Sequence, residues 1–324
     1  MTHVPVLPAE VLELLAPRAG EVYVDCTAGL GGHAAAVAPL VGPTGAIILN
    51  DVDPANLSRA VQNVQAAAPH TRIETHTGNF ADLPRKLSEQ AGGGGPRADM
   101  VLADLGFAST QVDDPKRGFS FSRDGPLDMR MDPSLPVTAA ELVATLPERE
   151  LAEVLRMYGE ERHAGRIARI LVREREHSPI TTTGRLADVV RSAVPRRSDP
   201  SSIDPATRTF QALRIVVNDE IGSLEALLAE VGRGARAAAA GKPTWLNPGA
   251  RVLVISFHSL EDRPVKQALA ELASQGLVEL LTDGPLGPTE EEAARNRRSR
   301  SSRLRACRIV GVRGQREKSR AGQV

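Results

Sequence analysis

The stretch from Glu21 to Pro54 constrains the fold more than any other part of the chain. It predicts a strand, a glycine turn, a helix, a second strand and a pair of acids in succession. Val22–Val24 and Ala46–Leu49 are short β-prone runs, and Ala34–Val41 favours a helix between them. The stretch is therefore a βαβ unit, from which α/β folds are built.

Glycines and acids in this unit are spaced as they are in nucleoside-binding folds. Gly29, Gly31 and Gly32 precede Asp51 and Asp53 by about twenty residues, the spacing at which a carboxylate binds the ribose hydroxyls of a nucleoside over a helix N-terminus. A glycine turn that serves only packing is the alternative. For Asp51 the alternative is a helix N-cap, although Asp53 is better placed for that role.

The glycine pattern also departs from the dinucleotide fingerprint. That fingerprint requires a glycine three residues after Gly31, where Ala34 stands. A ligand with a smaller anionic group than pyrophosphate therefore fits better. The amino acid carboxylate of S-adenosylmethionine, bound by backbone N–H groups at the start of the helix, meets that description.

Length and composition indicate one large domain or two ordinary ones. The chain has 324 residues, of which 41% are hydrophobic, and it contains no run of eighteen apolar residues. Its first residues lack a basic segment followed by an apolar core. We expect a cytoplasmic protein that does not bind a membrane. Cys26 and Cys307 are far apart and in no metal-ligand spacing, so reduced, packed thiols are expected.

The charges are balanced over the whole chain but not along it. The sequence has 40 basic and 40 acidic residues, yet its last thirty residues contain a single acid, Glu317. A solvated basic tail and a segment that neutralises phosphates of RNA or DNA are both compatible with this run. Its basic residues are Arg295, Arg297, Arg298, Arg300, Arg303, Arg305, Arg308, Arg313, Arg316, Lys318 and Arg320.

Later β-prone runs extend the predicted sheet. Arg72–His76 and Ala98–Asp104 continue the alternation of strands and helices, and Ala250–Phe257 follows after a long gap. Leu277–Leu281 and Leu304–Val312 predict an antiparallel edge pair. Since open α/β sheets hold ligands at the carboxyl ends of their strands, polar residues just after these runs are candidates for a site.

The gap before the last parallel strand predicts an insertion. A capping box at Thr138 and Glu141 marks the start of one of its helices. We predict an α/β domain of residues 1–110 and 211–324, interrupted by a mainly helical domain of residues 111–210. The predicted helices here are Val137–Leu146, Glu148–Tyr158, Arg162–Glu176, Thr183–Arg191 and Thr209–Val231.

Six polar clusters are too distinctive for ordinary loops. They hold six of the nine aromatic residues, which favours base stacking or a shaped pocket, although core packing is the alternative for each ring. The clusters are DLGFAS from Asp104, RGFSF from Arg117, DGPLDMRMDP from Asp124, YGEER from Tyr158, ATRTFQALR from Ala206 and SFHSLEDR from Ser256.

In spelling and order these motifs resemble the family of bacterial small-subunit ribosomal RNA methyltransferase H, also called MraW. The resemblance runs from HVPVL at His3 through TAGLGGH at Thr27 to RSSRLR at Arg300. It implies an α/β, class I (Rossmann-like) S-adenosylmethionine-dependent methyltransferase sheet with an inserted helical domain for substrate recognition. The implied activity is methylation of the exocyclic N4 of a cytidine in the decoding region of 16S rRNA. The implied partner is the small ribosomal subunit, and a homodimer is compatible with the resemblance.

The family's cofactor contacts carry over to positions of this sequence. The backbone of Gly31–His33 would meet the methionine carboxylate, Asp51 the ribose hydroxyls and Phe80 the adenine face. Asp104 would hold the cationic amino group, and Gln111 offers both a donor and an acceptor. The implied S-adenosylmethionine contacts are thus Gly31, Gly32, His33, Asp51, Phe80, Asp104 and Gln111.

Asp104 and His258 are the candidates for the chemistry. Amino methyltransferases often place Asp/Asn-Pro-Pro-aromatic after the fourth strand, where it accepts hydrogen bonds from the amine. The DLGF motif here keeps the acid and the aromatic residue but lacks both prolines. The role of Asp104 stays open because the same carboxylate can bind the cofactor. His258 follows the fifth strand, where a helix-capping arrangement with Ser259 and Glu261 is equally compatible.

Two other classes share part of these features. A nicotinamide oxidoreductase would share the βαβ unit but should complete the glycine fingerprint. A non-catalytic RNA-binding or ribosome assembly protein would share the basic run but would not need a ribose acid. No metal site is expected, since His70, Glu74 and His76 are near a strand without a further ligand. Candidates for RNA phosphates or structural ion pairs are Arg117, Arg130, Arg162, Arg208 and Arg263.

Overall fold

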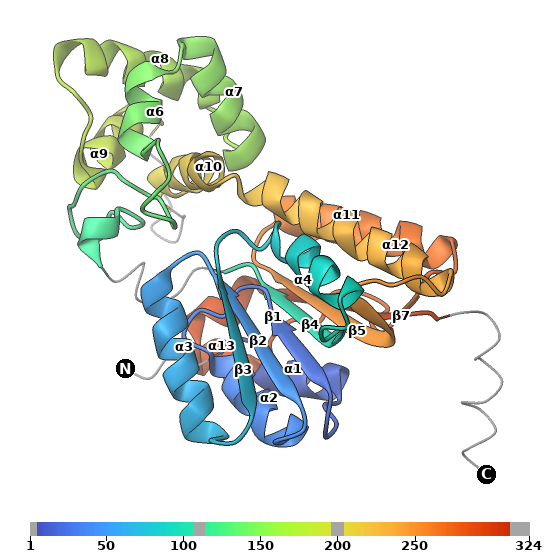
Figure 1. Cartoon of the computed structure of the whole chain (residues 1–324). Coiled ribbons are helices and arrows are strands. Elements are labelled where there is room, and N and C mark those ends of the chain that lie inside the picture. The colour runs from blue at the N-terminus through green and yellow to red at the C-terminus, as the bar shows by residue number, and fades with distance from the viewer. Residues whose placement is uncertain (1–4, 107–113, 196–203, 312–324) are drawn as a thin grey trace. The chain divides into compact units, whose positions relative to one another are not determined.

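Two compact units make up the chain in the computed structural model, which describes residues 5–106, 114–195 and 204–311. One unit consists of residues 1–106 and 222–324, and the other of residues 107–221 (Figure 1). The first is an α/β unit and the second is helical. The α/β unit is thus discontinuous in sequence, whereas the helical unit is one contiguous insertion.

A single sheet of seven strands forms the centre of the α/β unit, in the order β3-β2-β1-β4-β5-β7-β6. The first five strands in this order are parallel, and β7 is antiparallel to both of its neighbours. The predicted α/β fold class is confirmed. The strands are β1 Val22–Asp25, β2 Ala46–Asp51, β3 Arg72–Thr77, β4 Ala98–Asp104, β5 Leu246–Ser256, β6 Val278–Leu280 and β7 Arg303–Ile309.

The two late β-prone runs do pair antiparallel, as expected, but only one of them lies at the edge. β7 is inserted between β5 and the three-residue strand β6, so β7 is an interior strand. Its register places Arg303 opposite Ser256 and Arg308 opposite Arg251. The start of β7 therefore lies beside the carboxyl end of β5.

Helices cover both faces of the sheet (Figure 1). Along β5, Val252 and Val254 face one helical layer, while Leu253 and Ile255 face the other. This alternation follows from the two-residue period of a strand and explains why Val252–Ile255 is a continuous apolar run. One layer contains α1 Pro8–Leu15, α2 Gly32–Val41 and α3 Pro54–Ala67, and the other contains α4 Leu83–Gly92, α11 Glu220–Ala239 and α12 Ser259–Ser274.

The helical unit has its own apolar core, to which each of the helices described in it contributes. The predicted capping box is present, because Thr138 and Glu141 exchange hydrogen bonds at the start of α6. Across the described ranges of both units, no helix combines the length and apolar character needed to cross a membrane. The α-helices in the described part of this unit are α6 Ala139–Thr145, α7 Glu148–Gly159, α8 Ala164–His177, α9 Thr183–Ala193 and α10 Ala206–Asn218.

One predicted helix, Thr209–Val231, is in fact two, because α10 ends at Asn218 and α11 begins at Glu220. Between them Asp219 adopts a left-handed conformation with φ 45°. The Asn218 amide donates to the Met129 carbonyl and its oxygen accepts from the Met131 N–H, at 2.8 and 2.6 Å. These contacts with a distant loop fix the end of α10, and no helical periodicity reveals them.

Candidate functional site

Three acids stand at the carboxyl ends of the neighbouring parallel strands β1, β2 and β4. They are Asp25, Asp51 and Asp104, and the parallel pairing places them at one edge of the sheet. Burial raises the pKa of Asp25 to about 7 and the pKa values of Asp51 and Asp104 to about 6, from an ordinary 3.8. A cation bound among the three carboxylates would lower these pKa values again. The edge is therefore suited to a positively charged ligand.

Asp51 connects β2 to the glycine turn. Its two carboxylate oxygens accept hydrogen bonds from the Gly29 and Asp53 N–H groups, both at 2.8 Å. Asp53 caps α3 through the Ala55 N–H, as its position predicted. The Asn56 side chain also hydrogen-bonds this carboxylate. Since an ionised carboxylate has about four acceptor sites, Asp51 retains capacity for a hydroxyl group. Its carboxylate is thus held in a fixed orientation, as ligand binding would require.

Gly31 serves close packing inside the protein. Its φ is +76°, and a Cβ at this position would lie 2.7 Å from the Ala60 Cα of α3. The Gly31 N–H donates to the Ala28 carbonyl at 2.7 Å. Gly32 and His33 instead begin α2, where helix geometry gives the first N–H groups no acceptor within the helix. A carboxylate at this helix start would therefore be bound by the N–H groups of Gly32 and His33 rather than that of Gly31.

Asp104 lies close to His33, a pairing that the sequence did not reveal. The Nε2 of His33 is 3.8 Å from the Asp104 Oδ2, and His33 is buried. The Asp104 N–H donates to the Thr27 hydroxyl at 2.8 Å, across the β1–β4 pair. Thr27 belongs to the glycine turn, so this hydrogen bond fixes the acid that follows β4 to the turn that follows β1.

Phe80 follows β3 at the same edge. The Gly78 N–H donates to the Asp51 carbonyl at 3.0 Å, which holds the end of β3 against the end of β2. Phe80 is partly buried against the core layer that contains α4. Phe80 is thus three residues beyond the end of β3, the strand that pairs with the Asp51 strand β2. Gln111 falls outside the described residues, so its predicted cofactor contact stays a prediction.

Asp25 is a further candidate site residue, which the sequence reasoning missed. It is 2% exposed, accepts a hydrogen bond from the Tyr23 hydroxyl at 3.0 Å, and accepts the Thr27 N–H at 3.2 Å. Burial also raises the pKa of Tyr23, so its hydroxyl stays a donor. The sequence contained a signal that could have identified Asp25. It is the last residue of its strand, as Asp51 and Asp104 are of theirs, and it comes just before the glycine turn.

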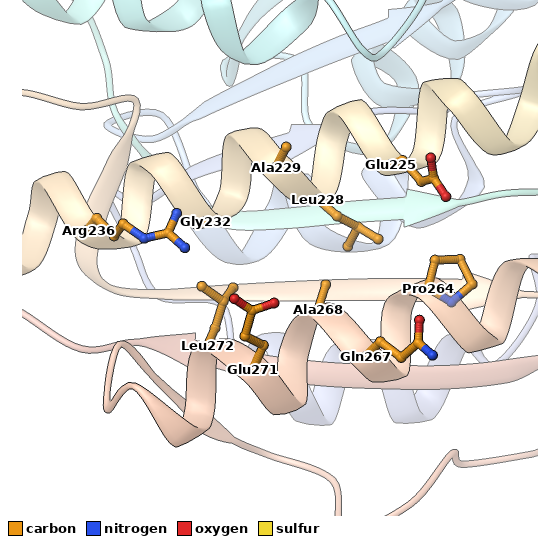
Figure 2. Close-up of a pocket in the computed structure, with 10 residues that line it drawn as sticks. All are labelled: Glu225, Leu228, Ala229, Gly232, Arg236, Pro264, Gln267, Ala268, Glu271 and Leu272. Atoms are coloured by element: carbon orange, nitrogen blue, oxygen red, sulfur yellow. The ribbon is translucent and has the colours of Figure 1, made fainter.

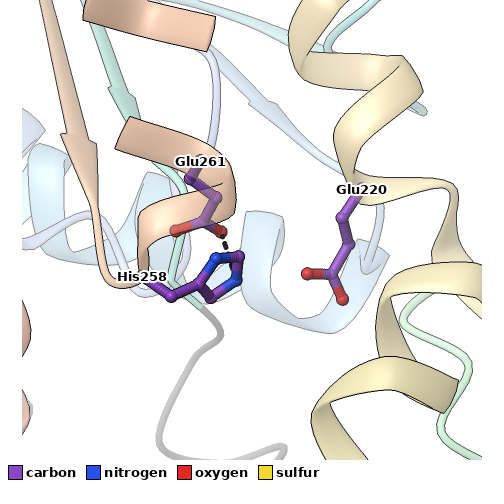
Figure 3. A group of neighbouring side chains, drawn as sticks. All are labelled: Glu220, His258 and Glu261. Carbon is purple, nitrogen blue, oxygen red and sulfur yellow. Dashed lines mark ion pairs between the residues drawn. The ribbon is translucent and has the colours of Figure 1, made fainter. Parts of the chain in front are cut away.

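His258 and Glu261 occupy the carboxyl end of β5, at the start of α12 (Figure 3). The Nε2 of His258 lies 3.3 Å from the Glu261 Oε1, and Glu261 is 3% exposed. Glu261 also accepts the Phe257 N–H at 2.7 Å, whereas the His258 side chain makes no cap hydrogen bond. Glu261 therefore performs the capping and also orients the imidazole. Glu220, the third labelled side chain, is bound by Arg214 of the helical unit.

The ends of β4 and β5 meet directly. The Leu105 N–H donates to the Ile255 carbonyl at 3.0 Å. A Cβ on Gly106 would lie 2.9 Å from the Phe257 ring, so glycine is required there for this ring to pack. His258 thus belongs to the same edge of the sheet as Asp104, as predicted from their positions after successive strands.

In the helical unit, several polar-cluster residues have structural partners. Arg130 binds both oxygens of Asp128 at 2.8 Å, and Arg117 donates to the carbonyls of Arg130 and Met131. The Phe121 ring packs edge-on against Phe210 at 4.8 Å. Of the alternatives weighed from the sequence, a structural ion pair is observed for Arg130 and packing in the core of the unit for Phe121 and Phe210, while Arg117 donates to backbone carbonyls.

A groove between α11 and α12 is a separate feature of the α/β unit (Figure 2). It has a volume of about 280 Å³, with an apolar floor that includes Leu228 and Leu272 between the charged side chains of Glu225, Arg236 and Glu271. None of the predicted site residues lines it. The chemistry is therefore better sought at the strand ends.

Comparison with known proteins decides the family. A model of the MraW methylase family matches residues 1–310. The chain belongs to the MraW methylase family. Among curated relatives, ribosomal RNA small subunit methyltransferase H of Acidobacterium capsulatum is 44% identical over 310 residues, covering 94% of this chain and 97% of the relative. The proteins of the same name from Gluconobacter oxydans and Solibacter usitatus are each 46% identical, covering 94% and 95% of this chain and 92% and 99% of their own.

Similarity between this MraW family member and solved structures is weaker. A putative rRNA-methylase from Clostridium thermocellum aligns with a TM-score of 0.46 at 11% identity, covering 96% of this chain and all of that one. A SAM dependent methyltransferase from Aquifex aeolicus aligns with a TM-score of 0.38 at 9% identity, covering 94% of this chain and 90% of that one. These likenesses are too weak to add to the family assignment.

The strand-end edge fits the methyl donor expected for a methylase. Asp25, Asp51 and Asp104 provide negative charge with raised pKa values, which matches a cationic ligand that also has hydroxyl groups. The start of α2 provides N–H groups for a carboxylate. Together these groups match the charges of S-adenosylmethionine, whose sulfonium and ammonium are positive and whose carboxylate is negative.

Proposed function

We propose that this protein transfers a methyl group from S-adenosyl-L-methionine to the exocyclic N4 amine of a specific cytidine in the decoding region of 16S rRNA. Membership of the MraW methylase family supports methyl transfer, and the names of the curated relatives support small-subunit rRNA as the substrate. The observation that carries the cofactor assignment is the set of three buried acids beside the glycine turn.

The donor site uses residues of the first four strand ends. S-adenosylmethionine supplies, when bound, a methyl group already activated by a positively charged sulfur. Asp51 would accept the ribose hydroxyls, and Phe80 would lie against the adenine. The N–H groups of Gly32 and His33 would bind the carboxylate. These contacts would leave Asp104 facing the positively charged part of the ligand.

The acceptor side must overcome the weak nucleophilicity of a cytosine amine. Its lone pair is delocalised into the ring, so the protein has to hold the amine in position and accept hydrogen bonds from its protons as the nitrogen becomes tetrahedral. Asp104 and His258 are the acceptors available at the ends of β4 and β5. Asp104 can serve either the amine or the ligand's ammonium, whereas His258, oriented by Glu261, would serve the amine.

The helical unit, predicted at residues 111–210, is proposed to recognise the RNA. The proposal also includes a cytoplasmic location and accommodates a homodimer. Light scattering of the purified chain measures the latter directly, since a monomer and a dimer differ twofold in mass.

The decisive experiment uses small ribosomal subunits from a strain that lacks this activity. They are incubated with the purified protein and labelled S-adenosylmethionine, and the labelled nucleotide is then mapped. We expect label on the amine of one cytidine of 16S rRNA. Label on any other group would disprove the substrate assignment, and no label at all would favour a non-catalytic RNA-binding or assembly protein.

Calorimetry separates the methyltransferase from the oxidoreductase alternative. We expect S-adenosylhomocysteine to bind with a dissociation constant in the micromolar range, on the order of −8 kcal/mol. NADH should not bind, because the glycine fingerprint for a dinucleotide is incomplete. Binding of NADH in place of S-adenosylhomocysteine would reverse the cofactor assignment.

A further inference from the structure

An arginine-rich turn leads into β7. The 3-10 helix η2 covers Arg297–Ser301, and side chains three residues apart align in such a helix. The burial of this segment follows that period, because Ser299 and Ser302 are buried at 0% and 3% exposure while Arg297, Arg300 and Arg303 are exposed. We call these three exposed residues the arginine edge.

Buried serines hold the backbone of this turn. The Ser299 hydroxyl donates to the Asn296 carbonyl at 2.8 Å, and the Ser302 hydroxyl donates to the Ser299 carbonyl at 2.7 Å. The Asn296 side chain accepts the Arg298 N–H at 3.3 Å. The turn is therefore ordered before any ligand arrives, which reduces the conformational entropy lost on binding.

The arginine edge carries positive charge beyond what nearby acids neutralise. Both oxygens of Asp262 bind Arg305, at 2.7 and 3.1 Å, while Arg303 is 3.4 Å away and 48% exposed. One carboxylate thus serves two guanidinium groups. The Arg300 Nε donates to the Ala293 carbonyl at 3.1 Å, which orients that side chain and leaves its other N–H donors for a ligand.

The topology brings this charge to the candidate active site. Because β7 is antiparallel, Arg303 at its start pairs with Ser256 at the end of β5, and the Ser256 hydroxyl donates to the Arg303 carbonyl at 3.2 Å. His258 is two residues beyond Ser256. Asp262, which binds two arginines, is next to Glu261, which orients His258. The arginine edge therefore adjoins the acceptor side of the sheet edge.

We propose that the arginine edge binds backbone phosphates of the RNA strand that delivers the target base. The proposal rests on the proposed function, since it concerns how the RNA substrate is held. Guanidinium groups suit phosphates because their planar N–H donors match two phosphate oxygens at once. In a 3-10 helix, two arginines that are three residues apart in sequence are about 6 Å apart along the axis. Each arginine can therefore bind a different phosphate.

The test compares Arg297→Gln/Arg300→Gln with a control of equal charge change, Arg85→Gln/Arg233→Gln. The control arginines are 62% and 65% exposed on α4 and α11. Affinity for a single-stranded RNA oligonucleotide is measured by fluorescence anisotropy over a range of KCl concentrations, with S-adenosylhomocysteine present. Binding of S-adenosylhomocysteine itself checks that each variant is folded.

We expect the test variant to lower the slope of log affinity against log salt by about 1.4, which corresponds to two phosphate contacts at about 0.7 each. Its KM for small subunits should rise about tenfold with kcat unchanged, since phosphate contacts position the RNA. The control should keep the wild-type slope and KM.

An unchanged slope in the test variant would overturn the proposal, as would an equal loss in the control, which would show an effect of net charge alone. Wild-type protein that binds RNA without salt dependence would overturn it too. Failure of the wild type to methylate small subunits would instead count against the proposed function, because the salt slope is measured without any methyl transfer.

Discussion

The two ends of one sheet edge have opposite electrostatic character. At the ends of β1, β2 and β4, carboxylates are gathered and their pKa values are raised. At the end of β5 and the start of β7, arginines outnumber the acids that pair with them, and a histidine lies beside a buried glutamate. Although the whole chain has equal numbers of acidic and basic residues, acidic side chains are thus concentrated at one end of this sheet edge and basic side chains at the other. The acidic end suits a cationic methyl donor, and the basic end suits a polyanionic acceptor.

Asp104 is the residue at which the two ends meet, so its substitution tests the comparison most severely. We expect Asp104→Ala to lower kcat by about 10²–10⁴-fold, the range found when a group that accepts or donates a proton is removed. Single-turnover methylation of small subunits measures this. Asp104→Asn, which keeps an acceptor for the Gly106 N–H, shows whether the charge is needed. Retained activity in the alanine variant would shift the chemistry to His258.

Substitution of Asp51 tests the acidic end of the sheet edge without affecting the basic end. We expect Asp51→Ala to abolish calorimetric binding of S-adenosylhomocysteine, a loss of about 100-fold or more, because the ribose acceptor is gone and the Gly29 and Asp53 N–H groups lose theirs.

The matched control for Asp51 is Asp53→Asn, which removes the same charge two residues away. Asparagine caps a helix about as well as aspartate, so this variant should bind within about threefold of wild type. Equal losses in the two variants would show that general negative charge, rather than the Asp51 carboxylate, attracts the ligand.

Substitutions of His258 and Glu261 test the basic end of the sheet edge. We expect His258→Gln to lower kcat about 100-fold and Glu261→Gln about tenfold, since the glutamate acts by orienting the imidazole. Binding of S-adenosylhomocysteine should not change in either. His70→Gln, at an exposed position, serves as the control. A weakened cofactor affinity with normal kcat would place His258 on the donor side and contradict the division of the edge.

The smallest expected effect is on stability as a function of pH. An acid whose pKa is raised in the folded state contributes stability below its unfolded pKa, and this is lost as the pH rises through the folded value. For Asp25, Asp51 and Asp104 the loss falls between about pH 4 and 7. The ligand-free protein should therefore have a lower Tm at pH 8 than at pH 5.

Asp25→Asn isolates the residue with the highest of these pKa values. Asparagine cannot ionise, so the variant should lose less stability than wild type as the pH rises. The Tm of the variant minus that of wild type should therefore increase by several °C from pH 5 to pH 8, at about 2–4 °C per kcal/mol. Differential scanning fluorimetry without ligand measures the two profiles. Parallel profiles would show that Asp25 does not titrate in this range.

Local patterns predicted much of this architecture. The fourth strand was predicted at Ala98–Asp104 and is found there, and the capping box at Thr138 is formed. Periodicity and capping are properties of neighbouring residues, so they can be read along the chain. The position of Asp104 at a strand end was predictable for the same reason.

What escaped prediction depends on contacts between distant residues. Thr27 accepts a hydrogen bond from the Asp104 N–H across 77 residues, and His33 lies close to the same acid from the start of α2. From the sequence alone, the basic run that begins at Arg295 is compatible with a solvated tail, and it is the antiparallel pairing of β7 that places one of its residues, Arg303, beside Ser256. Such proximity follows from strand order, and no local pattern encodes it.

The interior position of β7 also sets the order in which the protein can be completed during synthesis. β4 ends at Asp104 and β5 begins at Leu246, so roughly 140 residues, about 7–28 s of translation, separate two strands that pair directly. The helical unit is contiguous and can fold during that interval. The open side of β5 stays unpaired until residues 303–309 have been made. Until then the nascent chain exposes an apolar strand edge of the kind that chaperones protect.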